Sequence, residues 1–398
     1  MVGIVWHEDE GVLRRFDRTS LMPTEGRVEL GHNGWPWSFS PDKSRVAVAG
    51  GAPLEVRIVD VRRMRLNGEV PIPRNVAPPA NQPDVVALAW PTAHRIFALV
   101  EWGAWGHALI VVDPVVRRIV SRETIQGTLV GQAQTFDGFA LLLAPAASIG
   151  PARLLIVGRA GRRRSISLAE IPAGLESIDP HRGISRLDRP ALAVDPTGTH
   201  ALVASAGGPV AEVDLAGAQV TYHTLPDPDS LLGRLWNWLE PAAEAKAQEG
   251  PERQAAWIGE HVVAVSGQDS HRFGNGDQEQ TTPAGLTIID VRHWTERTLD
   301  KHASQFSFAA GTLLAYGTSW NSATQKTTGM GLTAYGLDGK ERFHLFEDEP
   351  IYYVQTARPY AYIWRNNRSP VAVDLRSGRV IRNLDRYRGN DLPAIMVP

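Results

Sequence analysis

Hydrophobic and polar positions alternate in short blocks along almost the whole chain. Runs rich in Val, Ile, Leu and aromatic residues are separated by polar turns such as Pro41-Asp42, Asp137-Gly138 and Asp338-Gly339. Short apolar runs of this composition are typical of β-strands, and Gly, Pro and Asp at the breaks are typical of tight turns. The pattern predicts an all-β chain whose strands are buried on both faces.

The predicted strands recur as a unit of two halves. The strand-turn-strand half occurs at 38–50, 88–100, 134–145, 192–206, 255–267, 306–317 and 353–364. The second half is an apolar strand, with an I/V-x-Asp pattern at 58–60, 111–113 and 288–290, followed by a turn and a further strand. It occurs at 56–70, 110–122, 154–168, 210–225, 286–299, 332–346 and 371–384. Seven complete units of four strands, with a period of roughly 45–60 residues, predict a β-propeller.

The two chain ends resemble one more unit that has been split. Three strand-like segments lie at 2–8, 11–17 and 26–31, and a fourth lies at 392–398. Pairing the C-terminal strand with the N-terminal three predicts eight four-stranded blades and a closed ring without exposed edges. Seven blades is the alternative. The continuous repeat predicts a single propeller domain over 1–398, with one insertion between blades at 227–254.

The sequence of this insertion predicts a short helix near 228–250. Leucines recur at every fourth residue from Leu231 to Leu239, which places them on one face of a helix. Trp236 and Trp238 would contact whatever that face covers. The helix could pack on the propeller itself, form a lid over the central funnel, or dock a partner.

Two kinds of segment carry a resemblance to a known family. SFSPDKSRVAVAG (38–50) and LAVDPTGTHALVASA (192–206) resemble an SPDG-x-x-hydrophobic unit, and AVDL in 371–384 resembles an h-x-D-h strand. The chain in this respect resembles WD40-like and YVTN-type bacterial β-propeller repeats, although the eukaryotic Gly-His and Trp-Asp signature is missing. The resemblance implies the propeller fold and no particular activity.

Composition and charge narrow the function classes. The net charge is −2, from 41 basic and 43 acidic residues, which does not favour bulk attraction to nucleic acid. The absence of cysteine excludes disulfides, thiol nucleophiles and cysteine-ligated metals. No apolar run reaches the ~20 residues of a membrane span. Without a recognisable leader, a cytoplasmic location is expected, or an extracytoplasmic one if a leader or anchor has been removed.

Long segments between strands fall on one predicted face of the propeller. They are the segments 73–84, 101–107, 172–190, 227–254, 266–285 and 317–331. Long loops on a rigid scaffold commonly carry function, although neutral drift also lengthens tolerated loops. We therefore expect a loop-elaborated face that binds a ligand or partner.

Aromatic and polar residues on this face are candidate contacts. Exposed aromatic rings could stack on a sugar or an aromatic ligand, and an arginine at the funnel mouth could hold an anion. The candidate binding residues are Trp102, Trp105 and His107 in 101–107, Trp320 and Asn321 in 317–331, and Arg365 and Asn366 in the turn after 353–364.

The segment 266–285 is rich in potential oxygen ligands. Asp269, His271, Asp277 and Glu279 lie within it, so it could wrap a calcium ion. The spacing does not match an EF-hand loop, and a flexible solvated loop is the alternative. His271 could also act as an acid–base group.

Two functions remain open from the sequence. One is a non-catalytic binding or scaffold propeller that recognises a protein, peptide or glycan through the elaborated face. The alternative is an enzyme with its site in the central funnel, a hydrolase, lactonase or lyase that could depend on a divalent metal. Neither a catalytic-triad order nor a phosphate-binding loop is evident, and no His or Glu recurs at the starts of the inner strands. This pattern favours binding.

Overall fold

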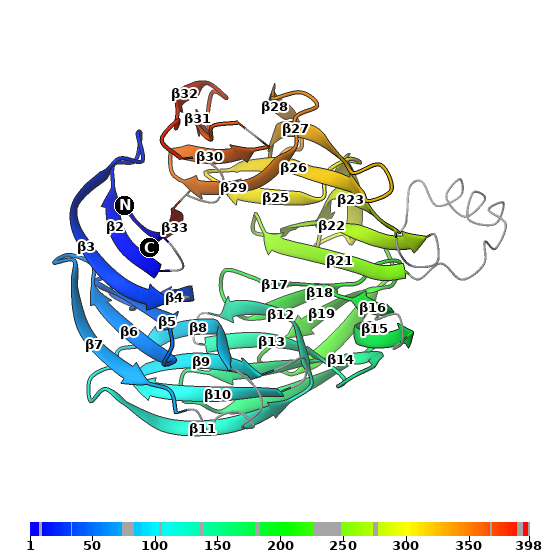
Figure 1. Ribbon diagram of the computed structural model, residues 1–398. Coiled ribbons are helices and arrows are strands. Elements are labelled where there is room, and N and C mark those ends of the chain that lie inside the picture. Colours follow the sequence, from blue (N-terminus) through cyan, green and yellow to red (C-terminus); the bar gives the residue numbers. More distant parts are fainter. Residues whose placement is uncertain are drawn as a thin grey trace, which may run out of the picture.

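The computed structural model describes residues 1–7, 10–32, 34–73, 83–102, 106–135, 138–179, 184–225, 248–273, 278–366, 368–387 and 393–396. Every regular element within these ranges is a β-strand. The strands form antiparallel sheets set side by side around a common axis (Figure 1). The prediction of an all-β chain built from repeated four-stranded sheets is confirmed. In the described ranges, no helix is long and apolar enough to span a membrane.

The described strands form seven hydrogen-bonded sheets. The first holds β1 (Val2–His7), β2 (Glu10–Phe16), β3 (Pro23–His32) and β33 (Ala394–Met396). The next two hold β4 (Gly34–Phe39), β5 (Arg45–Gly50), β6 (Glu55–Asp60) and β7 (Arg65–Pro71), then β8 (Asp84–Thr92), β9 (Arg95–Trp102), β10 (Gly106–Asp113) and β11 (Arg118–Gln126). The following two hold β12 (Thr128–Thr135), β13 (Gly138–Ala144), β14 (Ile149–Gly158), β15 (Arg163–Asp179) and β16 (Ile184–Asp188), then β17 (Ala191–Val194), β18 (His200–Ala204), β19 (Val210–Asp214) and β20 (Gln219–His223).

The last two sheets complete the chain. An eight-stranded sheet holds β21 (Gln248–Trp257), β22 (Val262–Phe273), β23 (Gln278–Asp290), β24 (Thr295–Asp300), β25 (Gln305–Ala309), β26 (Thr312–Asn321), β27 (Lys326–Gly336) and β28 (Glu341–Leu345). The final sheet holds β29 (Ile351–Ala357), β30 (Tyr360–Arg365), β31 (Val371–Asp374) and β32 (Val380–Asn383). The eight-stranded sheet consists of two four-stranded antiparallel units, β21–β24 and β25–β28, which meet at the pair Gln280 and Asn321.

The first and last segments of the chain share one sheet. β33 pairs antiparallel with β1, and Val2 lies opposite Met396 while Ile4 lies opposite Ala394. Figure 1 shows the short β33 between the N-terminal strands and β29 of the last sheet. Met396 is fully buried, so this pairing also contributes to the apolar core.

The core lies between neighbouring sheets, and β13 shows how one strand serves two interfaces. All its residues are buried. Phe139 and Leu141 face the preceding sheet, where Phe139 packs on Phe97 with ring centroids 6.3 Å apart. Leu142 faces the following sheet and belongs to the same cluster as Val203. Because side chains alternate along a strand, both faces of the sheet are apolar, as the sequence pattern predicts.

In five units the third strand ends in an aspartate, which caps the turn between the third and fourth strands. The Asp214 carboxylate accepts hydrogen bonds from the backbone N–H groups of Ala216 and Gly217 at 2.8 and 3.0 Å. The N–H groups of Gly217 and Ala216 hold the pKa of Asp214 below its usual value, because they favour the charged carboxylate. The same bonding recurs at Asp60, Asp113, Asp290 and Asp374. The repeated aspartate is therefore a turn-forming residue.

The helical insertion expected near 228–250 is only partly within the described residues. Residues 226–247 lie outside them, as do Trp236 and Trp238. From Gln248 onward the chain forms β21, so the expected insertion boundary at 254 is wrong. The reason is pairing: Pro251 lies opposite Asp269, which extends the strand backwards from the predicted start at 255.

Candidate functional site

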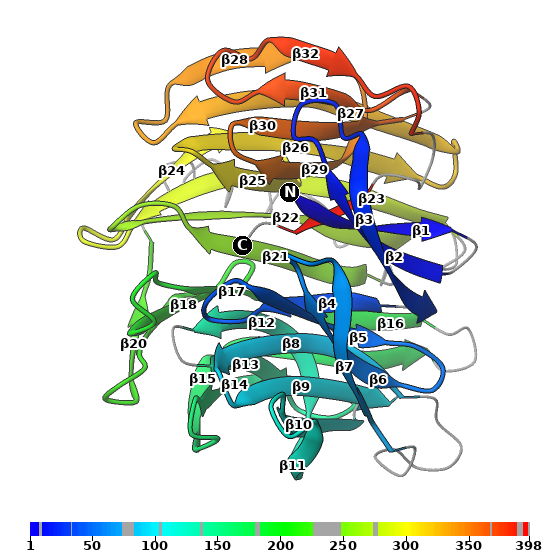
Figure 2. The same ribbon diagram turned by 90° about the vertical axis from the view of Figure 1, so that its left-hand side faces the viewer.

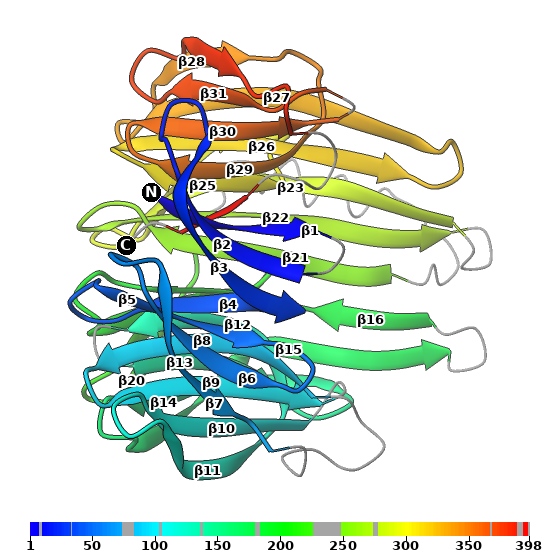
Figure 3. The ribbon, with the colours of Figure 1, turned by 60° about the vertical axis from the view of Figure 1, so that its left-hand side comes forward.

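Several strands project beyond their sheets on one face of the protein, toward the right in Figure 3. We call these parts the projecting wall, which comprises 174–179, 184–188, 248–254, 266–273, 278–285, 317–321 and 326–331. The sequence predicts loops over most of these residues, and within the described ranges that prediction is wrong. The long segments lie on one face, as expected, but their described residues form β-hairpins instead of loops.

Backbone pairing explains why these polar segments are strands. Asp269 lies opposite Thr282 in one hairpin, and Ser319 lies opposite Thr328 in another. Both faces of these hairpins carry polar side chains, so no apolar alternation marks them in the sequence. Each strand nevertheless supplies hydrogen-bond partners for the backbone of its neighbour. The result is a more rigid surface than loops would give.

The wall continues from one sheet to the next. The Arg189 N–H donates to the Pro251 carbonyl oxygen, and the Arg253 N–H donates to the Arg189 carbonyl oxygen, both at 2.9 Å. On the other side, the Ser319 hydroxyl donates to the Thr281 carbonyl oxygen at 2.5 Å. Hydrogen bonds to backbone carbonyl groups therefore join hairpins of three units, those of β12–β16, β21–β24 and β25–β28, into one surface.

Ion pairs line the part of the wall around β16, β21 and β22. Arg189 Nη1 lies 2.5 Å from Glu252 Oε1. Arg253 Nη1 lies 2.7 Å from Asp269 Oδ1, and Arg186 Nε lies 3.2 Å from Asp188 Oδ1. Each arginine thus has an acidic partner, so this surface presents alternating charge rather than one sign.

The predicted metal ligands lie on the β22–β23 hairpin. Asp269 and His271 are two positions apart on β22 and therefore share a face of the strand. Asp269 is already paired with Arg253. Asp277 lies outside the described residues, and for Glu279 the structure describes the strand position but not the side chain. Among the described side chains, no group of three or more His, Asp or Glu residues could hold a metal ion.

Trp320 and Asn321 lie at the tip of β26 on the wall. The Trp320 N–H donates to the Thr281 hydroxyl at 2.9 Å, which fixes the strand beside β23. Asn321 Oδ1 accepts the Thr324 N–H at 3.2 Å, so its side chain supports the hairpin turn. Both side chains remain partly exposed and belong to the surface that a partner would meet.

Of the predicted contacts in 101–107, His107 packs inward. His107 is 1% exposed; its Nδ1 lies 3.1 Å from the Gly127 carbonyl oxygen and its Nε2 lies 3.5 Å from Glu101 Oε2. A β-carbon at Gly106 would lie 2.2 Å from Trp102 Nε1, so glycine allows the indole to lie close to the backbone. Trp105 lies outside the described residues. His107 supports the hairpin and does not present its ring to solvent.

Arg365 and Asn366 hold the turn after β30. Arg365 Nη1 lies 3.3 Å from Glu349 Oε2, and its guanidinium lies 4.6 Å from the centre of the Phe346 ring. The Asn366 N–H donates to the Pro350 carbonyl oxygen at 3.1 Å. An anion at Arg365 would have to compete with the Glu349 carboxylate.

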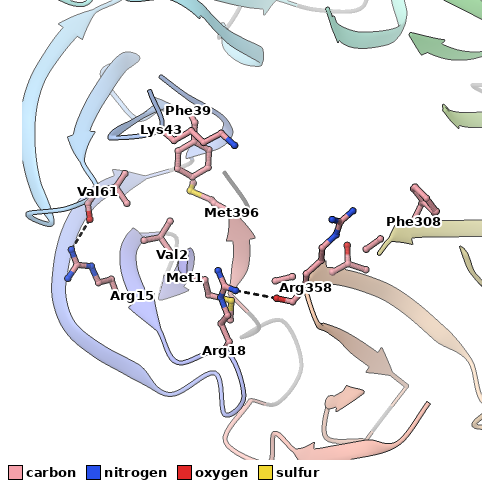
Figure 4. Close-up of a pocket in the computed structure, with 13 residues that line it drawn as sticks. Met1, Val2, Arg15, Arg18, Phe39, Lys43, Val61, Phe308, Arg358 and Met396 are labelled. Carbon is pink, nitrogen blue, oxygen red and sulfur yellow. Dashed lines mark hydrogen bonds between the residues drawn. The ribbon is translucent and has the colours of Figure 1, made fainter. Parts of the chain in front are cut away.

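A cavity lies on the opposite face, where the tight turns are, and no sequence pattern predicts it. The cavity has a volume of about 620 Å³ and lies where the N-terminal sheet meets the last sheet (Figure 4). Four of its lining residues are cationic, namely Arg15, Arg18, Lys43 and Arg358. They come from turns and strand ends far apart in the chain, so no local motif marks them.

Comparison with known proteins supports the architecture. No family model matches the chain, and no curated protein matches it in sequence. The chain is similar to a solved structure of dihydro-heme d1 dehydrogenase NirN in complex with DHE, with a TM-score of 0.55, 12% identity, and coverage of 99% of this chain and 73% of that chain. It is also similar to BamB from Moraxella catarrhalis (TM-score 0.46, 8% identity, 90% and 92% coverage) and to the computationally designed Ika8 protein (0.48, 11%, 89% and 88%). The first likeness shows the fold alone, which is that of a β-propeller.

Proposed function

We propose that the protein is a non-catalytic binding scaffold that recognises a protein or peptide partner through the projecting wall. The observation that carries this proposal is the wall itself, in which the hairpins of β21–β24 and β25–β28 extend on the same face of the protein. A scaffold that holds its binding surface in hydrogen-bonded strands loses little conformational entropy when a partner binds. Alternating ion pairs and hydroxyl groups suit a polar partner surface.

We further infer an eight-bladed ring of WD40-like, YVTN-type repeats. The pairing of β33 with β1 supports this inference, because it gives the N-terminal sheet a fourth strand. The division of the eight-stranded sheet into two four-stranded units supports the same count. The aspartate-capped turns support the type of repeat.

Site-specific photo-crosslinking in the native host tests the binding surface. A photoreactive phenylalanine analogue replaces Lys326 or Thr328, two exposed residues of the wall. The matched control replaces Val115, which is 55% exposed in a turn of the opposite face. We expect defined protein adducts from the wall positions and none from Val115.

Mass spectrometry then identifies the adduct, and its binding to the purified protein is measured. Thr328→Arg should weaken that binding at least tenfold because it places a bulky charge in the contact, whereas Val115→Arg should leave it unchanged. Equal adducts from both faces, or a wall that yields none while a glycan array gives saturable binding, would refute the proposed partner class.

A further inference from the structure

We propose that the cavity at the junction of the first and last sheets binds an amphipathic anion, a molecule with an apolar body and at least two acidic groups. This site lies on the face opposite the projecting wall and is independent of the function proposed above. Its volume of about 620 Å³ falls in the range of small-molecule sites, roughly 300–1,000 Å³.

The cavity is built by strand ends from several sheets. Met396 of β33 and Phe39 at the end of β4 lie together on one side, and Phe308 of β25 lies on the opposite side (Figure 4). Arg358, in the turn after β29, and Lys43, in the turn after β4, lie on different sides of this apolar surface. Charged groups therefore flank an apolar centre, and the ligand should have the same distribution.

Two of the four cations are engaged by backbone carbonyl groups. Arg15 donates to the carbonyl oxygens of Val61 and Arg62. Arg18 Nη1 donates to the Arg358 carbonyl oxygen at 3.3 Å. These bonds hold both guanidinium groups at the cavity lining, and among the described residues neither group has an ion-pair partner.

The other two cations have free head groups. Within the described part of the chain, neither the Lys43 ammonium nor the Arg358 guanidinium forms an ion pair or a side-chain hydrogen bond. Both residues are exposed at the cavity rim. A ligand can therefore reach them without breaking an existing pair, unlike the arginines of the wall.

The nearby acidic groups do not neutralise the cavity. No aspartate or glutamate is among the described residues that line it. The Asp42 carboxylate accepts hydrogen bonds from the hydroxyls of Ser40 and Ser44 at 2.6 and 2.7 Å. The Asp17 carboxylate accepts bonds from Thr19 and Ser20 within its own turn. Both carboxylates keep their negative charge within their own turns, and the four cationic lining residues exceed these two acids, so the positive charge is in excess.

The chemistry of these groups defines the ligand class. A guanidinium binds a carboxylate or phosphate through two parallel hydrogen bonds, and an ammonium binds either as a point charge. Phe39, Phe308 and Met396 favour an aliphatic or aromatic body between the acidic groups. A small inorganic anion would leave this apolar surface unused, and a neutral lipid-like molecule would leave the cations unpaired.

Calorimetric titration with three ligands of one chain length tests the proposal. The ligands are dodecanedioate, dodecanoate and the corresponding diol, which carry two, one and no acidic groups. We expect dodecanedioate to bind most tightly, dodecanoate at least tenfold more weakly, and the diol not at all. The affinity for the diacid should fall as ionic strength rises, because the rim cations are exposed.

Charge-neutralising variants locate the binding. The double variant Lys43→Gln/Arg358→Gln should weaken dodecanedioate binding at least tenfold, and Lys43→Gln alone should have an intermediate effect. Arg376→Gln/Arg379→Gln is the matched control, since it removes two exposed charges from another turn of the same face. Thermal melting confirms that all variants fold. Equal binding of the diol and the diacid, equal loss in the control variant, or no binding to the wild-type protein would overturn the proposal.

Discussion

Tyr362 and Arg18 lie 344 positions apart in the chain, and the Tyr362 hydroxyl donates a hydrogen bond to the Arg18 carbonyl oxygen at 2.5 Å. A second tyrosine makes an equivalent bond, from the Tyr387 hydroxyl to the Leu21 carbonyl oxygen. Both acceptors lie in the turn between β2 and β3, which reaches over to the last sheet (Figure 2). Two tyrosines therefore connect the N-terminal sheet to the C-terminal one.

Tyr362→Phe should destabilise this connection. Burial raises the pKa of the Tyr362 phenol, so the group remains a donor at neutral pH. Removing the hydroxyl leaves the Arg18 carbonyl without this donor, and we expect a loss of about 1–2 kcal/mol in the free energy of unfolding. Urea unfolding measures it. The control Tyr352→Phe removes a hydroxyl from a side chain that is 42% exposed. Equal unfolding midpoints for the two variants would contradict the assigned role.

The features that the sequence predicts well are local. The strand-turn-strand runs and the aspartate turns can be recognised because each depends on a few adjacent residues, such as Asp214 and the N–H groups that follow it. The sequence also predicts that the short segment at 392–398 pairs with the N-terminal strands, because each end lacks a complete unit. β33 pairs with β1 at Val2 and Met396, in agreement with that pattern.

The features that the sequence does not predict depend on distant contacts. The polar stretch around Asp269 has no alternation of apolar residues, and it becomes a strand because β21 and β23 lie on either side. Lys43 and Arg358 resemble ordinary turn residues, and only the arrangement of the sheets brings them to one cavity. His107 lies in a segment whose aromatic residues predict a ligand contact, but the packing of the hairpin buries its ring.

Removal of the C-terminal strand should expose a strand edge. A chain that ends at Tyr387 lacks the partner of Val2 and Ile4, and it also loses the fully buried Met396. An unpaired edge next to an apolar core favours association between molecules. We expect a lower melting temperature and oligomers in size-exclusion chromatography with light scattering. A peptide of residues 392–398 should restore the monomer, and a scrambled peptide should not; a stable monomer without any peptide would refute the role of β33.

Gly267→Ala should disturb the base of the projecting wall. A β-carbon at Gly267 would lie 2.0 Å from the Glu252 carbonyl oxygen, so β21 and β22 would have to separate. We expect a loss of about 1–3 kcal/mol in the free energy of unfolding. Hydrogen exchange should accelerate in both strands. Gly259→Ala is the control, since its nearest neighbour would lie at 3.5 Å. Unchanged exchange in β21 and β22 would show that the wall does not depend on this close approach.

The turn at Asp42, between β4 and β5, should make the stability of the protein sensitive to acid. Hydrogen bonds from the hydroxyls of Ser40 and Ser44 lower the pKa of Asp42 to about 2. A carboxyl group whose pKa is lower in the folded state stabilises the protein above the unfolded value, about 3.9, and this contribution is lost as the pH falls toward the folded value. The melting temperature should therefore fall between about pH 4 and pH 2. Asp42→Asn should flatten this part of the profile, because the amide does not titrate, and its melting temperature at pH 7 should be lower than that of the wild type.

Glu25→Gln, which removes an exposed carboxylate, should keep the wild-type profile. A profile for Asp42→Asn parallel to that of the wild type would show that this turn does not contribute to acid sensitivity.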